Sequence, residues 1–195
     1  MMNKLNRDNL FSLEKYAEVR PEFRARVMAH KKNRRLPIGP NAALYFEDAL
    51  TMQYQIQEML RIERIFEAAG IQEELDAYNP LIPDGSNWKA TFMMEYPDEN
   101  ERRVQLQKLL GIERHVWAQV ADFARVTPIA DEDLEREDEH KTSSVHFMRF
   151  ELTPEMVTAV KGGATVSMGI DHPAYTYAVE PVAQNIRDSL AQDLG

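Results

Sequence analysis

Residues 79–85, Asn79-Pro80-Leu81-Ile82-Pro83-Asp84-Gly85, separate two parts of the sequence that have different patterns. Two prolines and a glycine in so short a stretch interrupt any regular element, so this segment indicates a turn-rich boundary. Before it, apolar residues recur at helical spacing. After it, short alternating segments are separated by turns. We therefore predict an α+β protein, with a helical lobe over 1–84 and an α+β lobe over 85–195 that together form one compact unit.

The helical lobe is predicted to contain one long helix. Pro40 can occupy its first turn, and Gly70 follows Ala69 as its C-terminal stop. Thirty helical residues span roughly 45 Å. Apolar residues follow one another along this segment at 4-3-4-3 spacing: Tyr45, Ala49, Met52, Ile56 and Met59. The spacing predicts the spine of the helical lobe, or a surface for a partner helix.

The C-terminal lobe is predicted to form a mostly antiparallel sheet with short helices, against which the helical lobe packs. Alternating or apolar segments predict strands over 88–96, 116–126, 142–152, 164–170 and 175–179. Capping residues, prolines and glycines frame helices that begin near Asp98, Thr153 and Pro181. Short turns between strands favour antiparallel pairing.

Composition limits the chemistry of the chain. Among its 195 residues there are 0 Cys, which excludes disulfides, thiolate metal ligands and thiol nucleophiles. With 44% hydrophobic and 28% charged residues, no apolar run of membrane-spanning length and no signal-peptide pattern, we expect a soluble, cytoplasmic protein. Walker, Gly-x-Gly-x-x-Gly and Gly-x-Ser-x-Gly motifs do not occur.

Charge is unevenly distributed. Residues 1–36 carry 10 Lys or Arg and 4 Asp or Glu, whereas residues 37–195 carry 13 and 28. The candidate residues for binding an anion or a partner are Arg24, Lys31, Lys32, Arg34 and Arg35. No aromatic platform accompanies them apart from Phe23, so nucleic acid is not the expected partner. We expect this basic segment to meet acidic residues, such as the loop 131–139, within one chain or across a homo-oligomer.

Histidines and a carboxylate in the C-terminal lobe are candidate metal ligands. If strands 142–152 and 164–170 pair, His146 approaches Asp171 or His172, and His140 lies at the start of the first strand. Two His and a carboxylate could hold iron or another divalent ion, or act as a general acid/base pair. The alternative is that these histidines are structural and that Asp171-His172-Pro173 forms a turn.

Several stretches together resemble an uncharacterised bacterial family, a domain of unknown function of about this length. They are Arg20-Pro21-Glu22-Phe23-Arg24, 54–61, 78–83, 143–147 with Arg149-Phe150, and Asp171-His172-Pro173-Ala174-Tyr175. The resemblance covers almost the whole chain. It implies a genomic association with rubrerythrin-like and iron–sulfur proteins, and hence a role in oxidative-stress or iron redox metabolism. It implies no catalytic residues.

Two functional hypotheses follow. The first, which we favour, is a non-catalytic accessory or interaction protein that binds a protein partner or a second copy of itself. The second is a metal-binding protein or metal-dependent enzyme that uses His146, His172 and Asp171. Since the chain has 0 Cys, any iron–sulfur chemistry would belong to the partner.

Overall fold

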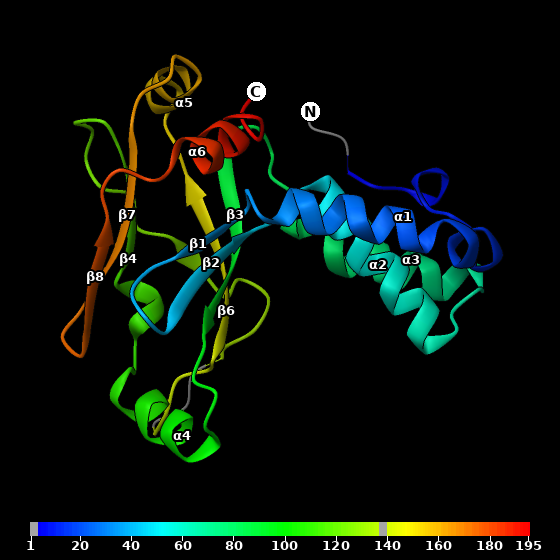
Figure 1. The fold of residues 1–195 in the computed structure, drawn as a ribbon, viewed down its shortest axis with the longest axis horizontal. Helices are drawn as coiled ribbons and strands as arrows, with labels where there is room; N and C mark the ends of the chain where they lie inside the picture. The colour runs from blue at the N-terminus through cyan, green and yellow to red at the C-terminus, as the bar shows by residue number, and fades with distance from the viewer. Residues whose placement is uncertain (1–3, 137–139) are drawn as a thin grey trace.

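The computed structural model describes residues 4–136 and 140–195. Figure 1 shows that the helices within residues 13–31 and 49–78 project to one side of two packed sheets, while the later helices lie at the ends of the sheets. The helices are α1 (Leu13–Lys31), α2 (Ala49–Glu63), α3 (Ala68–Tyr78), α4 (Glu99–Lys108), α5 (Pro154–Lys161) and α6 (Gln184–Ala191). The strands are β1 (Arg35–Pro37), β2 (Ala42–Phe46), β3 (Asn87–Met94), β4 (Val116–Val120), β5 (Ile129–Ala130), β6 (Val145–Glu151), β7 (Val166–His172) and β8 (Tyr175–Val179). The predicted α+β class is confirmed.

The strands form two antiparallel sheets. One sheet has the order β1-β2-β3-β6-β5, and the other has the order β4-β7-β8. Their facing side chains build the main core, in which Trp88, Phe92 and Phe150 of the first sheet join Val116 and Met168 of the second. The core therefore lies between the sheets, as in other two-layer β structures.

The opposite face of the five-stranded sheet does not contact the second sheet. Along β3 the side chains of Lys89, Thr91 and Met93 alternate with the buried core residues of the same strand. In the antiparallel register Lys89 is opposite Arg149, and Thr91 is opposite Phe147. We call this surface the open face. It carries both charged and apolar side chains, which point away from the core because successive side chains of a strand point to opposite sides.

The long helix predicted over 40–69 is wrong. Residues Ala42–Phe46 form β2, a strand whose apolar side chains are mostly buried. The Asp48 carboxylate then accepts a hydrogen bond from the Thr51 N–H at 2.9 Å and caps α2 at its start. Arg64 ends α2 in the left-handed conformation, with φ 55°. Tyr45, Ala49 and Met52 have the spacing of one helical face. In the structure, however, Tyr45 lies in β2, whereas Ala49 and Met52 lie in α2, which begins after the capping box at Asp48.

The helical lobe has its own small core between α1 and α2. Tyr16, Phe23, Val27 and Tyr54 are buried there. Beside them, the Tyr16 hydroxyl donates to Glu58 at 2.7 Å, and the Arg20 guanidinium contacts the same carboxylate at 2.7 Å. These hydrogen bonds fix α1 against α2 because they satisfy a largely buried carboxylate. No helix in the described part of the chain is both long and apolar enough to span a membrane.

Candidate functional site

His146 lies in the middle of a buried chain of hydrogen bonds. Its Nδ1 is 2.6 Å from Asp131 Oδ2, and its Nε2 is 2.9 Å from Thr142 Oγ1. The order Thr–His–Asp resembles that of a nucleophile, a base and an orienting carboxylate. However, His146 is 0% exposed and Thr142 is 2% exposed, so this arrangement offers no surface to a substrate. It holds the residues around β5 against β6.

The strand pairing that would bring His146 to Asp171 does not form. β6 pairs with β3 and β5, whereas β7 pairs with β4 and β8 in the other sheet. Asp171 instead forms an exposed ion pair with Arg125, at 2.6 Å. The predicted pairing of strands 142–152 and 164–170, from which His146 and Asp171 were grouped, is therefore wrong.

His172 is held by backbone groups. The Ala174 N–H donates to its Nδ1 at 3.1 Å, so the ring proton lies on Nε2 and is donated to the Leu110 carbonyl at 3.0 Å. The His115 ring meets it edge-on at a centroid distance of 5.1 Å. His140 is exposed on the loop before β6. Within residues 4–136 and 140–195, no group of three His, Asp or Glu side chains is arranged to hold a metal ion.

The predicted basic candidates separate into buried and exposed groups. Arg34 is 2% exposed and pairs with Asp193 at 2.7 Å, while burial raises the pKa of Asp193 to about 6. Arg35 pairs with Glu95 at 2.9 Å. Lys31 lies over the ring of Tyr54. Arg24 is exposed on α1, and Lys32 is exposed at the C-terminal cap of the same helix.

Acidic residues of 37–195 therefore do meet the basic segment within one chain, through Arg20, Arg34 and Arg35. Their partners lie on α2, near the C-terminus and after β3. In the described residues, no ion pair joins the basic segment to 131–136. Residues 137–139 of the predicted acidic loop lie outside the described residues.

A cleft of about 610 Å³ lies between the helical lobe and the open face. One wall comes from the end of α3 and the turn after it, with Tyr78, Pro80 and Leu81. The floor comes from β3 and β6, with Lys89, Phe147 and Arg149. A mostly apolar concave surface with a few polar groups is typical of a preformed binding site.

The two cations of the cleft are already paired. The Lys89 ammonium donates to the Pro80 carbonyl at 2.6 Å and is 3.1 Å from the Asp84 carboxylate. Arg149 donates to both oxygens of Glu132 and to Glu151. Arg149 lowers the pKa of Glu132 as a result. Intramolecular partners thus stabilise these charges before any ligand arrives.

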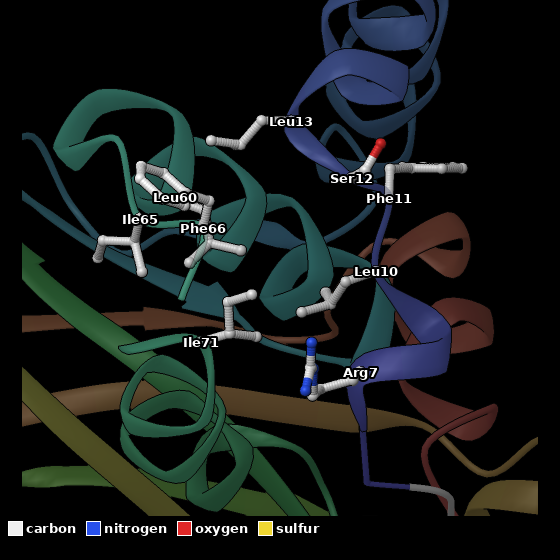
Figure 2. Close-up of a pocket in the computed structure, with 9 residues that line it drawn as sticks. All are labelled: Arg7, Leu10, Phe11, Ser12, Leu13, Leu60, Ile65, Phe66 and Ile71. Carbon is white, nitrogen blue, oxygen red and sulfur yellow. The ribbon is translucent and has the colours of Figure 1, made fainter. Parts of the chain in front are cut away.

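A second apolar hollow, of about 270 Å³, lies at the tip of the helical lobe. Figure 2 shows Leu10 on the N-terminal segment and Ile71 on α3 on either side of it, with Phe66 from the turn between α2 and α3. Phe66 is 73% exposed, and the neighbouring Ile62 is 58% exposed. Single exposed apolar side chains are common on protein surfaces, so this hollow by itself does not identify a binding site.

Fold and cleft together define an α+β protein with a preformed cleft between a helical lobe and a sheet. Over residues 4–194 the chain matches, and belongs to, the family described as Protein of unknown function (DUF3501). A solved structure of a novel protein of unknown function from Burkholderia pseudomallei is 52% identical, with a TM-score of 0.93 over 99% of this chain and 100% of that chain. No curated protein matches the sequence.

Sequence reasoning missed Asp131, the partner of His146, and the residues that line the cleft. The acidic loop 131–139 begins with Asp131 and Glu132, and in the structure these residues pair with His146 and Arg149 rather than with the basic segment. Lys89 was placed on a strand without any role. The alternation of β3 could have indicated that Lys89 faces away from the core, but the wall formed by α3 is a tertiary contact that no local pattern encodes.

Proposed function

We propose that this protein is a non-catalytic accessory protein that binds a segment of a partner protein in the cleft between its helical lobe and its sheet. The observation that carries the proposal is the combination of an apolar cleft of about 610 Å³ with cations that are already neutralised by intramolecular pairs. A catalytic site needs an ionisable group directed at a substrate. A binding site needs apolar area and a few fixed polar groups.

The resemblance drawn from the sequence implies a partner in oxidative-stress or iron redox metabolism, and we adopt this as part of the proposal. Since the chain has 0 Cys, the metal cluster or thiol chemistry would reside in the partner. We expect the encounter to take place in the cytoplasm. A second copy of this chain is the alternative occupant, in which case the protein forms a homo-oligomer.

Ala77 offers a way to block the cleft without disturbing the core. It lies on α3, lines the cleft and is exposed, so a tryptophan at this position projects into the cleft. Ala17 is an exposed alanine on α1 outside the cleft and provides the matched control. Surface substitutions of this kind change stability by about 0.5 kcal/mol or less.

The experiment is quantitative capture from extracts of the native host with immobilised wild-type protein, Ala77→Trp and Ala17→Trp. We expect wild-type protein and Ala17→Trp to retain the same partner and Ala77→Trp to lose it. Size-exclusion chromatography of the three purified proteins shows whether each one self-associates. It therefore distinguishes binding of a different protein from binding of a second copy of this chain. Equal capture by all three would show that the cleft does not bind the partner.

A further inference from the structure

We infer that the segment bound in the cleft carries a basic side chain next to an apolar aromatic or aliphatic one. This inference rests on the proposed function, since it assigns the chemistry of the occupant of the same cleft. It derives from three features of the described residues: the apolar floor and wall, the engaged cations and the Asp76 carboxylate at the opening.

The floor favours an apolar group. Phe147 and Leu81 contribute an aromatic ring and an aliphatic side chain, and Tyr78 adds a second ring from α3. Burying a large apolar side chain there favours binding, because it removes apolar surface from water. The occupant therefore brings at least one such side chain.

The engaged cations disfavour an anionic group. To pair with Arg149, an incoming carboxylate would have to displace Glu132, which holds the guanidinium through two hydrogen bonds of 2.9 and 2.8 Å. To pair with Lys89, it would have to compete with the Pro80 carbonyl and Asp84. Each displacement exchanges one ion pair for another and gives no net gain.

The opening of the cleft favours a cation. Asp76 on α3 and Asp133 on the opposite loop both line it, but Asp133 already pairs with Arg136, so Asp76 is the carboxylate left for an incoming cation. Asp76 accepts a hydrogen bond from the Gln72 amide, a neutral partner that leaves its charge uncompensated. A carboxylate in this position attracts a cation, and the net charge of −9 on the chain adds a long-range attraction.

The open face also shows that a cation can lie on an aromatic ring there. The Arg136 guanidinium carbon is 4.6 Å from the centroid of the Phe147 ring, within the range of a cation–π contact. A lysine or arginine of the occupant can use the neighbouring Tyr78 in the same way. Basic and apolar groups therefore fit side by side.

An extended segment fits the site better than a small amine. A further cavity of about 290 Å³ lies on the same open face, lined by Tyr45, Thr91 and Met93. β3 connects the two, because Lys89 lines the first cavity while Thr91 and Met93 line the second. Four residues of strand span roughly 13 Å, a length that a peptide covers and a single amine does not.

The test uses two pentapeptides with the same central phenylalanine, valine and leucine, one flanked by lysines and the other by glutamates. Titration is followed by amide chemical shifts of the full chain, with phenylbutylamine as a third probe. We expect the lysine peptide to bind one to one, at least about fivefold tighter than its glutamate twin. Its shifts should map to Ala77, Leu81 and Phe147, and phenylbutylamine should bind more weakly than the peptide.

Three variants complete the test. Ala77→Trp should lower the affinity for the lysine peptide at least about tenfold, and Ala17→Trp should leave that affinity unchanged. Asp76→Asn should lower the affinity for the lysine peptide by roughly threefold and raise the affinity for the glutamate peptide. Equal affinity of the twins, or equal affinity of the peptide and phenylbutylamine, would overturn the inference. If host capture still depends on Ala77 in that case, the proposed function stands and only the chemistry of the occupant is wrong.

Discussion

Glu132 accepts hydrogen bonds from Arg149 through both carboxylate oxygens, at 2.9 Å from Nε and 2.8 Å from Nη2. Arg149 also donates to Glu151 at 2.6 Å. This bidentate pair joins the loop after β5 to the floor of the cleft. Because Arg149 is already held by Glu132, its guanidinium is not available to bind an anionic ligand. The pair therefore determines which charge the cleft can accept.

Replacing Glu132 by glutamine should therefore change the charge preference of the cleft. The Glu132→Gln variant frees part of the Arg149 guanidinium and removes one carboxylate from the opening. We expect the glutamate-flanked peptide to gain several-fold in affinity relative to its lysine twin. Since Glu132 is about half exposed, the free energy of unfolding should change by less than about 1 kcal/mol. An unchanged ratio of peptide affinities would contradict this account of the cleft.

The Glu58 carboxylate should make the stability of the helical lobe depend on pH. The hydrogen bond from Arg20 lowers its pKa to about 2, well below 4.5, with further contributions from Arg61 and Tyr16. Because the folded state holds the ionised form, this contribution is present above pH 4.5 and is lost as the pH falls towards 2.

Glu58→Gln should then lower the free energy of unfolding by about 2 kcal/mol at pH 7, and by progressively less below pH 4.5. Urea denaturation at a series of pH values measures the difference from wild-type protein. Glu18→Gln is the matched control, since Glu18 forms an exposed pair with Lys15. A difference that grows as the pH falls would have the wrong sign.

Substitution of His146 distinguishes a structural histidine from a metal ligand. His146→Ala removes buried hydrogen bonds to Asp131 and Thr142, so we expect the free energy of unfolding to fall by about 3 kcal/mol. His140→Ala, on an exposed loop, should cost less than about 1 kcal/mol. Elemental analysis of untagged protein should give the same metal content for both variants. A selective loss of iron, zinc or manganese in His146→Ala would favour the metal-binding alternative.

Gly169 permits a close approach between β7 and an aromatic side chain of β4. A Cβ at this position would collide with the Trp117 ring and would lie 2.8 Å from the Tyr177 carbonyl oxygen. Gly169→Ala should therefore cost about 2 kcal/mol or more and shift the tryptophan emission. Gly162→Ala, whose Cβ would come no closer than 3.3 Å to a neighbour, serves as the control. A stable Gly169→Ala variant with unchanged emission would refute this packing.

Local patterns predicted most elements of the C-terminal lobe, although β5 was missed and the strand predicted over 116–126 ends at Val120. The strand predicted over 175–179 is β8, and the helix framed by Thr153 and Gly162 is α5. Caps, prolines and alternation act within a few residues, so the sequence expresses them directly. The same approach failed over 40–69, where a buried strand and a helix have similar apolar spacing and where the pairing of β2 with β3 favours the strand.

The candidate site depended on contacts that no local pattern encodes. His146 was identified as chemically interesting, but its partner proved to be Asp131 rather than Asp171, because the register of β5 and β6 determines which residues meet. The cleft itself arises where α3 passes the open face. Its walls come from segments that lie far apart in the sequence. The distance between these walls and the ion pairs across them could therefore be seen only in the three-dimensional structure.

Photo-crosslinking in the native host tests the central claim, that the cleft binds the partner, most directly. Benzoylphenylalanine is introduced in place of Ala77 in the cleft or of Ala17 on α1, and crosslinked products are identified by mass spectrometry. Our account predicts a specific crosslink from position 77 to a segment in which basic and apolar residues adjoin, and none from position 17. The same products from both positions, or products from position 17 alone, would contradict it.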